Sequence, residues 1–349
     1  MREWLKNWWP VAKVLLALAV LFFIGRRFAR DLRSPELWHR SFDAGWMVCS
    51  GLLYVLALFC SALLWHRLLR GFNQQPTFVT TLRAYYLGQL GKYVPGKAIS
   101  LVMRATLEAG PHVRVGLAGL TAFYEVLTTM AAGALLAALL FFVLLPDTGA
   151  AFDWEALWGL FRLDAPAAAV LDRTIFVLFA LVLYGIIGPF TWPAVINRLA
   201  QRFAKPFRDK NAPPLPRFRL RFLGEGMALA ACGWLLLGAS LWAMLQAVLS
   251  SPPDLTLQTW GLATGFMAVS YVAGFLFLFV PSGLGVREFF LALFLVDPLA
   301  GRPRSSILLA VLLLRVVWTT AELVVALAVY FLPRSAQSET PSATSATSQ

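Results

Sequence analysis

Charged residues are scarce in this 349-residue chain. They make up 14% of the sequence, against 59% for hydrophobic residues, and the mean hydropathy is +0.70. About a quarter of the residues of an ordinary soluble domain are charged. No polar stretch is long enough to fold as a separate soluble domain. The composition therefore predicts a single transmembrane domain over residues 1–333, followed by a Ser/Thr-rich tail, 334–349, that we expect to be disordered.

Cysteine and histidine are also scarce, with three of each. The cysteines lie inside apolar runs and lack a C-x-x-C spacing, which excludes a disulfide framework and a zinc site. The histidines, His39, His66 and His112, are dispersed, and we expect them in headgroup water rather than on a metal. A nucleophile triad and a phosphate loop are lacking as well. We therefore expect no cofactor, no metal and no enzymatic activity.

The net charge of +12 comes from basic residues in short loops between apolar runs. This distribution favours anionic lipid headgroups over nucleic acid as partners. Loop 196–225 is strongly basic and loop 146–172 is acidic, so the positive-inside rule places the first in the cytoplasm and the second outside. Counting back puts the N-terminus in the cytoplasm. The basic loop 25–43 disagrees with this orientation, which we keep because loop 196–225 is far more basic.

Seven apolar runs are long enough to cross a hydrocarbon core of roughly 30 Å. They cover residues 8–24, 44–64, 115–145, 173–195, 227–249, 260–280 and 305–331. The first run follows Arg2 and Lys6 and has no small-x-small cleavage site, which indicates an uncleaved signal anchor. The predicted fold is all-α and polytopic, with about seven transmembrane helices.

Two further stretches are too broken to cross the membrane as single helices. Residues 77–110 contain several glycines, Pro95 and four basic residues, and the apolar piece that follows Pro281 stops after roughly 16 residues, short of the ~20 that a span needs. Half-length apolar segments flanked by Gly and Pro are typical of re-entrant helices, whose unpaired backbone groups must be sheltered in protein or in a wet cavity. One such segment in each half of the chain predicts a transporter-like site between two structural repeats. Whether the two halves form an inverted repeat stays open.

The first broken segment carries the motif Gly-Lys-Tyr-Val-Pro-Gly-Lys, residues 91–97. Pro95 and Gly96 turn the chain, and a helix that starts after them presents free N–H groups. These groups, with Lys92, Tyr93 and Lys97 beside them, suit a phosphate. The alternative is an interfacial loop whose lysines extend toward the headgroups.

The second motif is Pro-Ser-Gly-Leu-Gly-Val-Arg-Glu, which starts at Pro281. Gly283 and Gly285 allow the backbone to approach a ligand, and Arg287 offers a planar fork for a phosphate or a carboxylate. Glu288 is a candidate partner for that arginine. The alternative is a turn at a helix start with a structural ion pair.

A charged residue inside a span costs roughly 2.5 to 3.5 kcal/mol on insertion scales and so should face the bundle interior, and three such residues stand out. They are Glu125, Arg315 and Glu322. Arg315 and Glu322 share one helix face, but a rise of about 10 Å excludes a direct salt bridge. We expect Glu125 to pair with Arg104 or Arg315, and Glu322 with Arg287. Structural pairing and substrate contact both stay open.

In their order along the chain, these motifs resemble the lysylphosphatidylglycerol synthase transmembrane-region family, a flippase-like membrane domain. The resemblance covers roughly residues 10–332 and is carried by the two glycine motifs together with Arg104, Glu125, Arg315 and Glu322. It departs from many members at Glu125-Val126, where they have Glu-Arg, and in the lysine-containing form of the first motif. The aminoacyl-transferring domain of the fused members has no counterpart here, so we do not expect lysyl transfer.

The resemblance implies a multi-pass protein of the bacterial cytoplasmic (inner) membrane that moves a phospholipid or a lipid-linked glycan between leaflets. Without an ATP site, movement would be passive or ion-coupled, with Glu125, Glu288 and Glu322 as proton carriers. The alternative is an accessory protein or enzyme of lipid or glycan synthesis that binds lipid phosphate without moving it, together with partner enzymes. A scaffold for other membrane proteins is a third reading.

Overall fold

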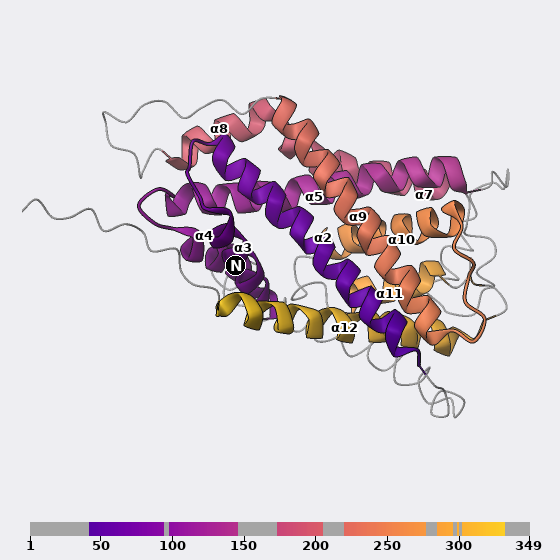
Figure 1. Cartoon of the computed structure of the whole chain (residues 1–349). Coiled ribbons are helices and arrows are strands. Elements are labelled where there is room, and N and C mark those ends of the chain that lie inside the picture. The colour runs from indigo at the N-terminus through magenta and orange to yellow at the C-terminus, as the bar shows by residue number, and fades with distance from the viewer. Residues whose placement is uncertain are drawn as a thin grey trace, which may run out of the picture.

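The computed structural model describes residues 42–93, 98–145, 173–204, 220–276, 285–295, 299 and 302–331. Within these ranges it is all-α, with ten α-helices and two short 3-10 helices (Figure 1). Six of the helices are long and apolar enough to cross a membrane, which agrees with a multi-pass membrane protein. The first predicted span, 8–24, and the tail, 334–349, lie outside the described residues.

The six long helices match the predicted spans closely at their starts or their ends. They are α2 (Ala44–Gly71), α5 (Val115–Leu144), α7 (Arg173–Ile187), α9 (Leu220–Val248), α10 (Leu257–Leu276) and α12 (Arg304–Tyr330). The predicted span 173–195 corresponds to α7 and the following turn, Arg173–Thr191, and ends four residues earlier than predicted. The chain leaves the α-helix at Gly188-Pro189, forms η4 (Gly188–Thr191) and then the amphipathic helix α8 (Pro193–Ala204). Proline causes this break, since it cannot donate to the preceding turn.

Helices α2 and α9 form an antiparallel pair near the middle of the bundle (Figure 1). At one end the Asp43 N–H donates to the Ala247 carbonyl at 3.2 Å. Farther along, the hydroxyls of Ser50 and Ser240 each donate to the other residue's carbonyl at 2.8 Å. Such small polar residues let two helix backbones approach in an apolar environment. We call the two ends of the bundle the Asp43 end and the Gly71 end.

Contacts at the two ends fix the direction of the other long helices. The start of α10 lies beside the end of α5, where Gln258 Nε2 donates to the Leu144 carbonyl. Just before α12, Arg302 donates to the Ser251 carbonyl at the Asp43 end. At the other end of α12 the Arg83 guanidinium lies 5.7 Å from the Tyr330 ring. Helix α12 therefore runs from the Asp43 end toward the Gly71 end, as α2 does.

Two short helical elements penetrate this bundle. Helices α3 (Phe78–Gln89) and α4 (Ile99–Glu108), with η2 (Leu90–Tyr93) between them, form a hairpin that begins and ends near the Gly71 end. There Gln75 N–H donates to the His112 carbonyl at 3.2 Å. Helix α11 (Val286–Leu295) packs against α10. Helices of 10 to 12 residues are about 15 to 18 Å long, half of a membrane core. Neither broken stretch crosses as a single helix, as predicted.

The close packing of α9 against α10 yields a first prediction. A Cβ at Gly238 would lie 1.9 Å from Thr264 Oγ1 and 2.7 Å from Thr264 Cα on α10. We therefore expect Gly238→Ala to push the helices apart and to destabilise the protein by ~1–3 kcal/mol. Heat unfolding in detergent micelles measures this change.

The matched control is Gly224→Ala on the same helix, where a Cβ would meet no atom within 4 Å. It should leave the unfolding temperature unchanged or raise it slightly, because alanine favours helix by about 1 kcal/mol. A Gly238→Ala protein as stable as the control would contradict the packing.

Candidate functional site

A buried carboxylate joins the tip of the α3–α4 hairpin to the bundle. Glu322 on α12 is 1% exposed. Its Oε1 accepts hydrogen bonds from the Tyr54 hydroxyl on α2 and from Lys92 Nζ on η2, and its Oε2 accepts one from the Tyr93 hydroxyl at 2.8 Å. Lys92 Nζ also donates to the Tyr54 oxygen at 3.3 Å. The hairpin tip is thus attached to two long helices through Glu322.

A second carboxylate organises the start of α11. Arg287 Nη2 donates to Glu288 Oε1 at 2.8 Å, and Arg315 Nη1 lies 4.0 Å from the same oxygen. Glu288 Oε2 accepts the Gly285 N–H at 2.8 Å, and Gly285 has φ 81°, which favours glycine. The Arg287 guanidinium lies 4.0 Å from the Tyr271 ring centroid. Glu288 therefore binds the helix start and Arg287, and lies within ion-pair distance of Arg315.

Aromatic rings connect these two carboxylate sites along α12. The Arg315 guanidinium lies 5.7 Å from the Tyr93 ring. One turn farther, Trp318 stacks on Tyr54 at 4.3 Å and lies 6.0 Å from the Tyr271 ring. Residues of the hairpin tip, α2, α10, α11 and α12 therefore form one polar cluster inside the bundle.

We call Lys92, Arg287, Glu288, Arg315 and Glu322 the charge cluster. Three of its members are cationic and two are anionic, so the charge cluster carries a surplus of one positive charge. Arg315 Nη2 is buried and has no hydrogen-bond partner among the described residues. A buried, charged donor without a partner is costly, which makes this nitrogen the natural contact for an added anion.

The structure brings together residues that flank both predicted turns. Lys92 and Tyr93 precede the first turn, Gly285 and Arg287 follow the second, and α12 lies between them. Five residues predicted for the site lie outside the described residues, so their placement stays a prediction. They are Pro95, Gly96, Lys97, Pro281 and Gly283.

The predicted pairing of Glu322 with Arg287 is wrong. Glu322 binds Lys92 because it lies two turns beyond Arg315 toward the Gly71 end, where the hairpin tip arrives. Arg287 instead pairs with its neighbour Glu288, as the motif suggested. Tyr54 was missed by sequence reasoning. A tyrosine within an apolar span, whose hydroxyl needs a partner when buried, was the available signal.

The predicted pair of Arg104 with Glu125 is confirmed, at 2.8 Å between Nη2 and Oε2. Both side chains are buried, and the guanidinium lies 4.8 Å from the Trp65 ring and 4.2 Å from the Tyr85 ring. A Cβ on Gly88 would lie 2.2 Å from Arg104 Cγ, so this glycine makes room for the arginine. Among the described residues, no hydrogen bond or ion pair joins Arg104 or Glu125 to the charge cluster. The geometry is that of a structural pair.

Among the described residues, a cavity lined by Tyr271, Arg287, Glu288, Arg315 and Trp318, among others, has a volume of about 10 Å³, enough for about one water. The space between these side chains is therefore too small for a lipid headgroup, which could enter this cavity only if they moved apart.

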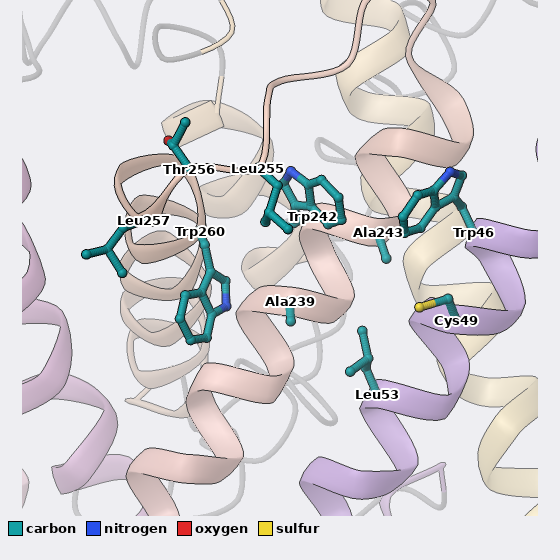
Figure 2. A pocket seen from close by; sticks show the side chains of 10 residues that line it. All are labelled: Trp46, Cys49, Leu53, Ala239, Trp242, Ala243, Leu255, Thr256, Leu257 and Trp260. Atoms are coloured by element: carbon teal, nitrogen blue, oxygen red, sulfur yellow. The ribbon is translucent and has the colours of Figure 1, made fainter.

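A larger cavity of about 430 Å³ lies at the Asp43 end between α2, α9 and the start of α10 (Figure 2). Three tryptophans line it, Trp46, Trp242 and Trp260. No charged side chain lines it, so it offers no cation to a phosphate. The charge cluster, and not this larger cavity, is therefore the candidate headgroup site.

In comparisons with known proteins, no family model matches the chain, and no curated protein matches it.

Among the described residues, no group of three or more His, Cys, Asp or Glu side chains could hold a metal ion. His66 was expected in headgroup water but is buried, and its Nδ1 lies 3.1 Å from Thr81 Oγ1.

The buried Arg104–Glu125 pair yields a second prediction. Glu125→Gln leaves the guanidinium buried without its carboxylate, and we expect the loss to be roughly 3–5 kcal/mol of stability. Heat unfolding in micelles tests it. Glu225→Gln is the matched control, because the Arg221–Glu225 pair is exposed and such pairs contribute at most about 1 kcal/mol. Equal unfolding temperatures for the two variants would show that the buried pair is not structural.

Proposed function

We propose that this protein moves an anionic phospholipid or lipid-linked glycan between the leaflets of the bacterial inner membrane, binding the lipid phosphate in the charge cluster. The observation that carries the proposal is the surplus positive charge buried where the tip of the α3–α4 hairpin and the start of α11 both contact α12. Arg315 Nη2, which has no hydrogen-bond partner among the described residues, lies in this cluster.

Charge balance favours an anionic ligand. A monoanionic phosphodiester supplies one negative charge, which neutralises the surplus of the charge cluster. Guanidinium groups are planar forks that match phosphate oxygens, and Arg287 and Arg315 both face the small cavity. A zwitterionic headgroup would bring an ammonium as well, and the charge cluster already holds three cations. Anionic lipids should therefore be preferred.

Entry of a headgroup requires the hairpin tip to leave Glu322. Lys92 and Tyr93 are both on the tip, and both donate to this carboxylate, so a phosphate oxygen that accepts the same hydrogen bonds can replace it. Tyr93 is 38% exposed, and the Lys92 side chain is 21% exposed. The tip is thus the accessible side of the charge cluster, from which a headgroup could approach while the acyl chains stay in lipid.

The motif order supports the same reading, because it resembles a flippase-like membrane domain. The half-length helices support it too, since irregular backbone between half-length helices at membrane depth is typical of transporter binding sites. Two further parts belong to the proposal. The cytoplasmic position of the N-terminus rests on the charge of the loops, and the partner enzymes of lipid or glycan synthesis rest on the resemblance.

Removing the Arg315 guanidinium, whose Nη2 has no hydrogen-bond partner among the described residues, tests the proposal. A hydrogen bond to a charged group contributes about 1.5–3 kcal/mol, and each 1.4 kcal/mol is tenfold. Arg315→Gln should therefore slow leaflet transfer of fluorescent phosphatidylglycerol in proteoliposomes by roughly tenfold or more. The preference for phosphatidylglycerol over phosphatidylcholine should shrink as well.

Arg221→Gln is the matched control, because the Arg221 side chain is 86% exposed. Arg221 is at the start of α9, a helix that contributes no residue to the charge cluster. It should transfer lipid like the wild type. Unchanged transfer in Arg315→Gln, with the protein folded, would overturn the proposal. Bound phosphatidylglycerol without transfer in the wild type would favour the alternative, a protein that holds lipid phosphate for synthesis without moving it.

A further inference from the structure

One buried carboxylate stands apart from the others. The structure describes four, and Glu125, Glu288 and Glu322 each contact a cation. Glu108, the last residue of α4, is 3% exposed and makes no ion pair with any described residue. Within the part of the chain that the structure describes, its Oε1 hydrogen-bonds only with Thr81 Oγ1, and its Oε2 is buried without a hydrogen-bond partner. A carboxylate anion in this setting is costly, whereas a neutral carboxyl group is not.

The hydrogen bonds of the Thr81 hydroxyl indicate whether Glu108 carries a proton. Its oxygen lies 2.9 Å from Glu108 Oε1 and 3.1 Å from the Thr77 carbonyl, but the hydroxyl has one hydrogen to donate. A helical threonine commonly donates to the carbonyl four residues earlier. If Thr81 does so, the contact with Glu108 is a hydrogen bond only when Glu108 is the donor. The geometry therefore fits a protonated Glu108.

The charged and titratable groups on the surrounding elements do not supply a counter-ion. They are Arg104 on α4, Arg83 on α3, Glu125 on α5, His66 with Arg67 and Arg70 on α2, and His112 and Arg114 on the connecting loop. Arg104, one turn before Glu108, directs its Nη2 to Glu125 at 2.8 Å. His66 reaches Glu108 only through Thr81. Burial accordingly raises the pKa of Glu108 to about 8.

We propose that Glu108 is a proton-binding site, and that Thr81 and His66 form the path by which its proton is exchanged. His66 Nδ1 lies 3.1 Å from Thr81 Oγ1, five residues before the end of α2. The transfer requires the Thr81 hydroxyl to turn from the Thr77 carbonyl toward His66 Nδ1. The O–H bond of Glu108 then breaks and its proton passes to Thr81 Oγ1, while the proton of Thr81 passes to Nδ1 of a His66 that carries its ring proton on Nε2. A carboxylate and an imidazolium result, and protons and charge balance.

Glu108 ends the returning helix of the hairpin whose tip attaches to Glu322. If lipid transfer is the function, loss of the proton would place an unpaired charge at the base of this hairpin and favour its movement. This coupling rests on the proposed function, but the proton site does not. Glu108, which sequence reasoning did not select, would then be the proton carrier instead of the three ion-paired carboxylates.

Infrared spectroscopy of the full-length protein in detergent micelles tests the site directly. In pH-difference spectra we expect a protonated carboxyl C=O band that disappears with a midpoint near pH 8. Glu108→Gln should remove the band, and Glu225→Gln, at an exposed position, should keep it. A spectrum unchanged by Glu108→Gln, or a band that does not titrate up to pH 10, would overturn the proposal.

Stability supplies a second readout, with a sign fixed by linkage. The unfolded carboxyl has a pKa of about 4.3, so above this pH the unfolded state releases a proton that the folded state keeps. The unfolding temperature of the wild type should therefore fall as the pH rises from about 5 to 8. Glu108→Gln should flatten this dependence, and an equally steep fall in the variant would contradict a proton held by Glu108.

Thr81→Val keeps the proposal testable if Glu108→Gln does not fold. Once Glu108 is ionised, the Thr81 hydroxyl can donate to the carboxylate instead of to the Thr77 carbonyl, and a hydrogen bond to a charged acceptor is the stronger of the two. The variant removes this donor, so the midpoint of the band should move to higher pH. An unmoved midpoint would exclude Thr81 from the path. Neither spectrum requires lipid transfer, so the two proposals can fail separately. Lipid transfer by a protein whose Glu108 does not titrate would overturn the proton site alone. A protein whose Glu108 titrates but which transfers no lipid would overturn the proposed function alone.

Discussion

The structure depends on one constraint: a charge buried among apolar helices must have a partner. Glu322 shows its effect, because this carboxylate collects donors from α2 and from the tip of the α3–α4 hairpin. Hydrophobic packing alone would leave the tip free to slide, since lipid tails are as apolar as the helix surface. The ionic and hydrogen-bonding contacts therefore set where the hairpin stops inside the bundle.

The buried charges serve three different purposes under this constraint. Arg104 and Glu125 pair closely, lie against aromatic rings and hold the hairpin to α5. The charge cluster has more cations than anions, and under the proposed function it accepts an added anion. Glu108 pairs with no cation among the described residues, and under our proposal a bound proton neutralises it. A single hairpin thus carries a fixed contact, a contact that an anion can replace and a site that a proton can fill.

These purposes are linked through the hairpin itself. Lys92 and Tyr93 at its tip, Arg104 within its returning helix and Glu108 at the end of that helix belong to one short element about half a membrane thick. Movement of the tip away from Glu322 would be transmitted along α4 to the carboxyl group of Glu108, because ten residues of helix form a stiff unit. Under the proposed function, lipid binding at the tip and proton binding at the base would influence each other reciprocally.

The sequence by itself determined the membrane architecture, because apolar run length and glycine-proline breaks are local properties. Six long helices begin or end within a few residues of the predicted spans, and both broken stretches form short helices. Tertiary structure alone decided which charges meet. Glu322 binds Lys92, more than two hundred residues away, rather than the predicted Arg287, and a tyrosine from α2 joins them. Helix direction and the depth of the hairpin fix these contacts, and neither is encoded in a residue's local pattern. Glu108 escaped notice for the same reason, since only three-dimensional burial separates it from any other glutamate at a helix end.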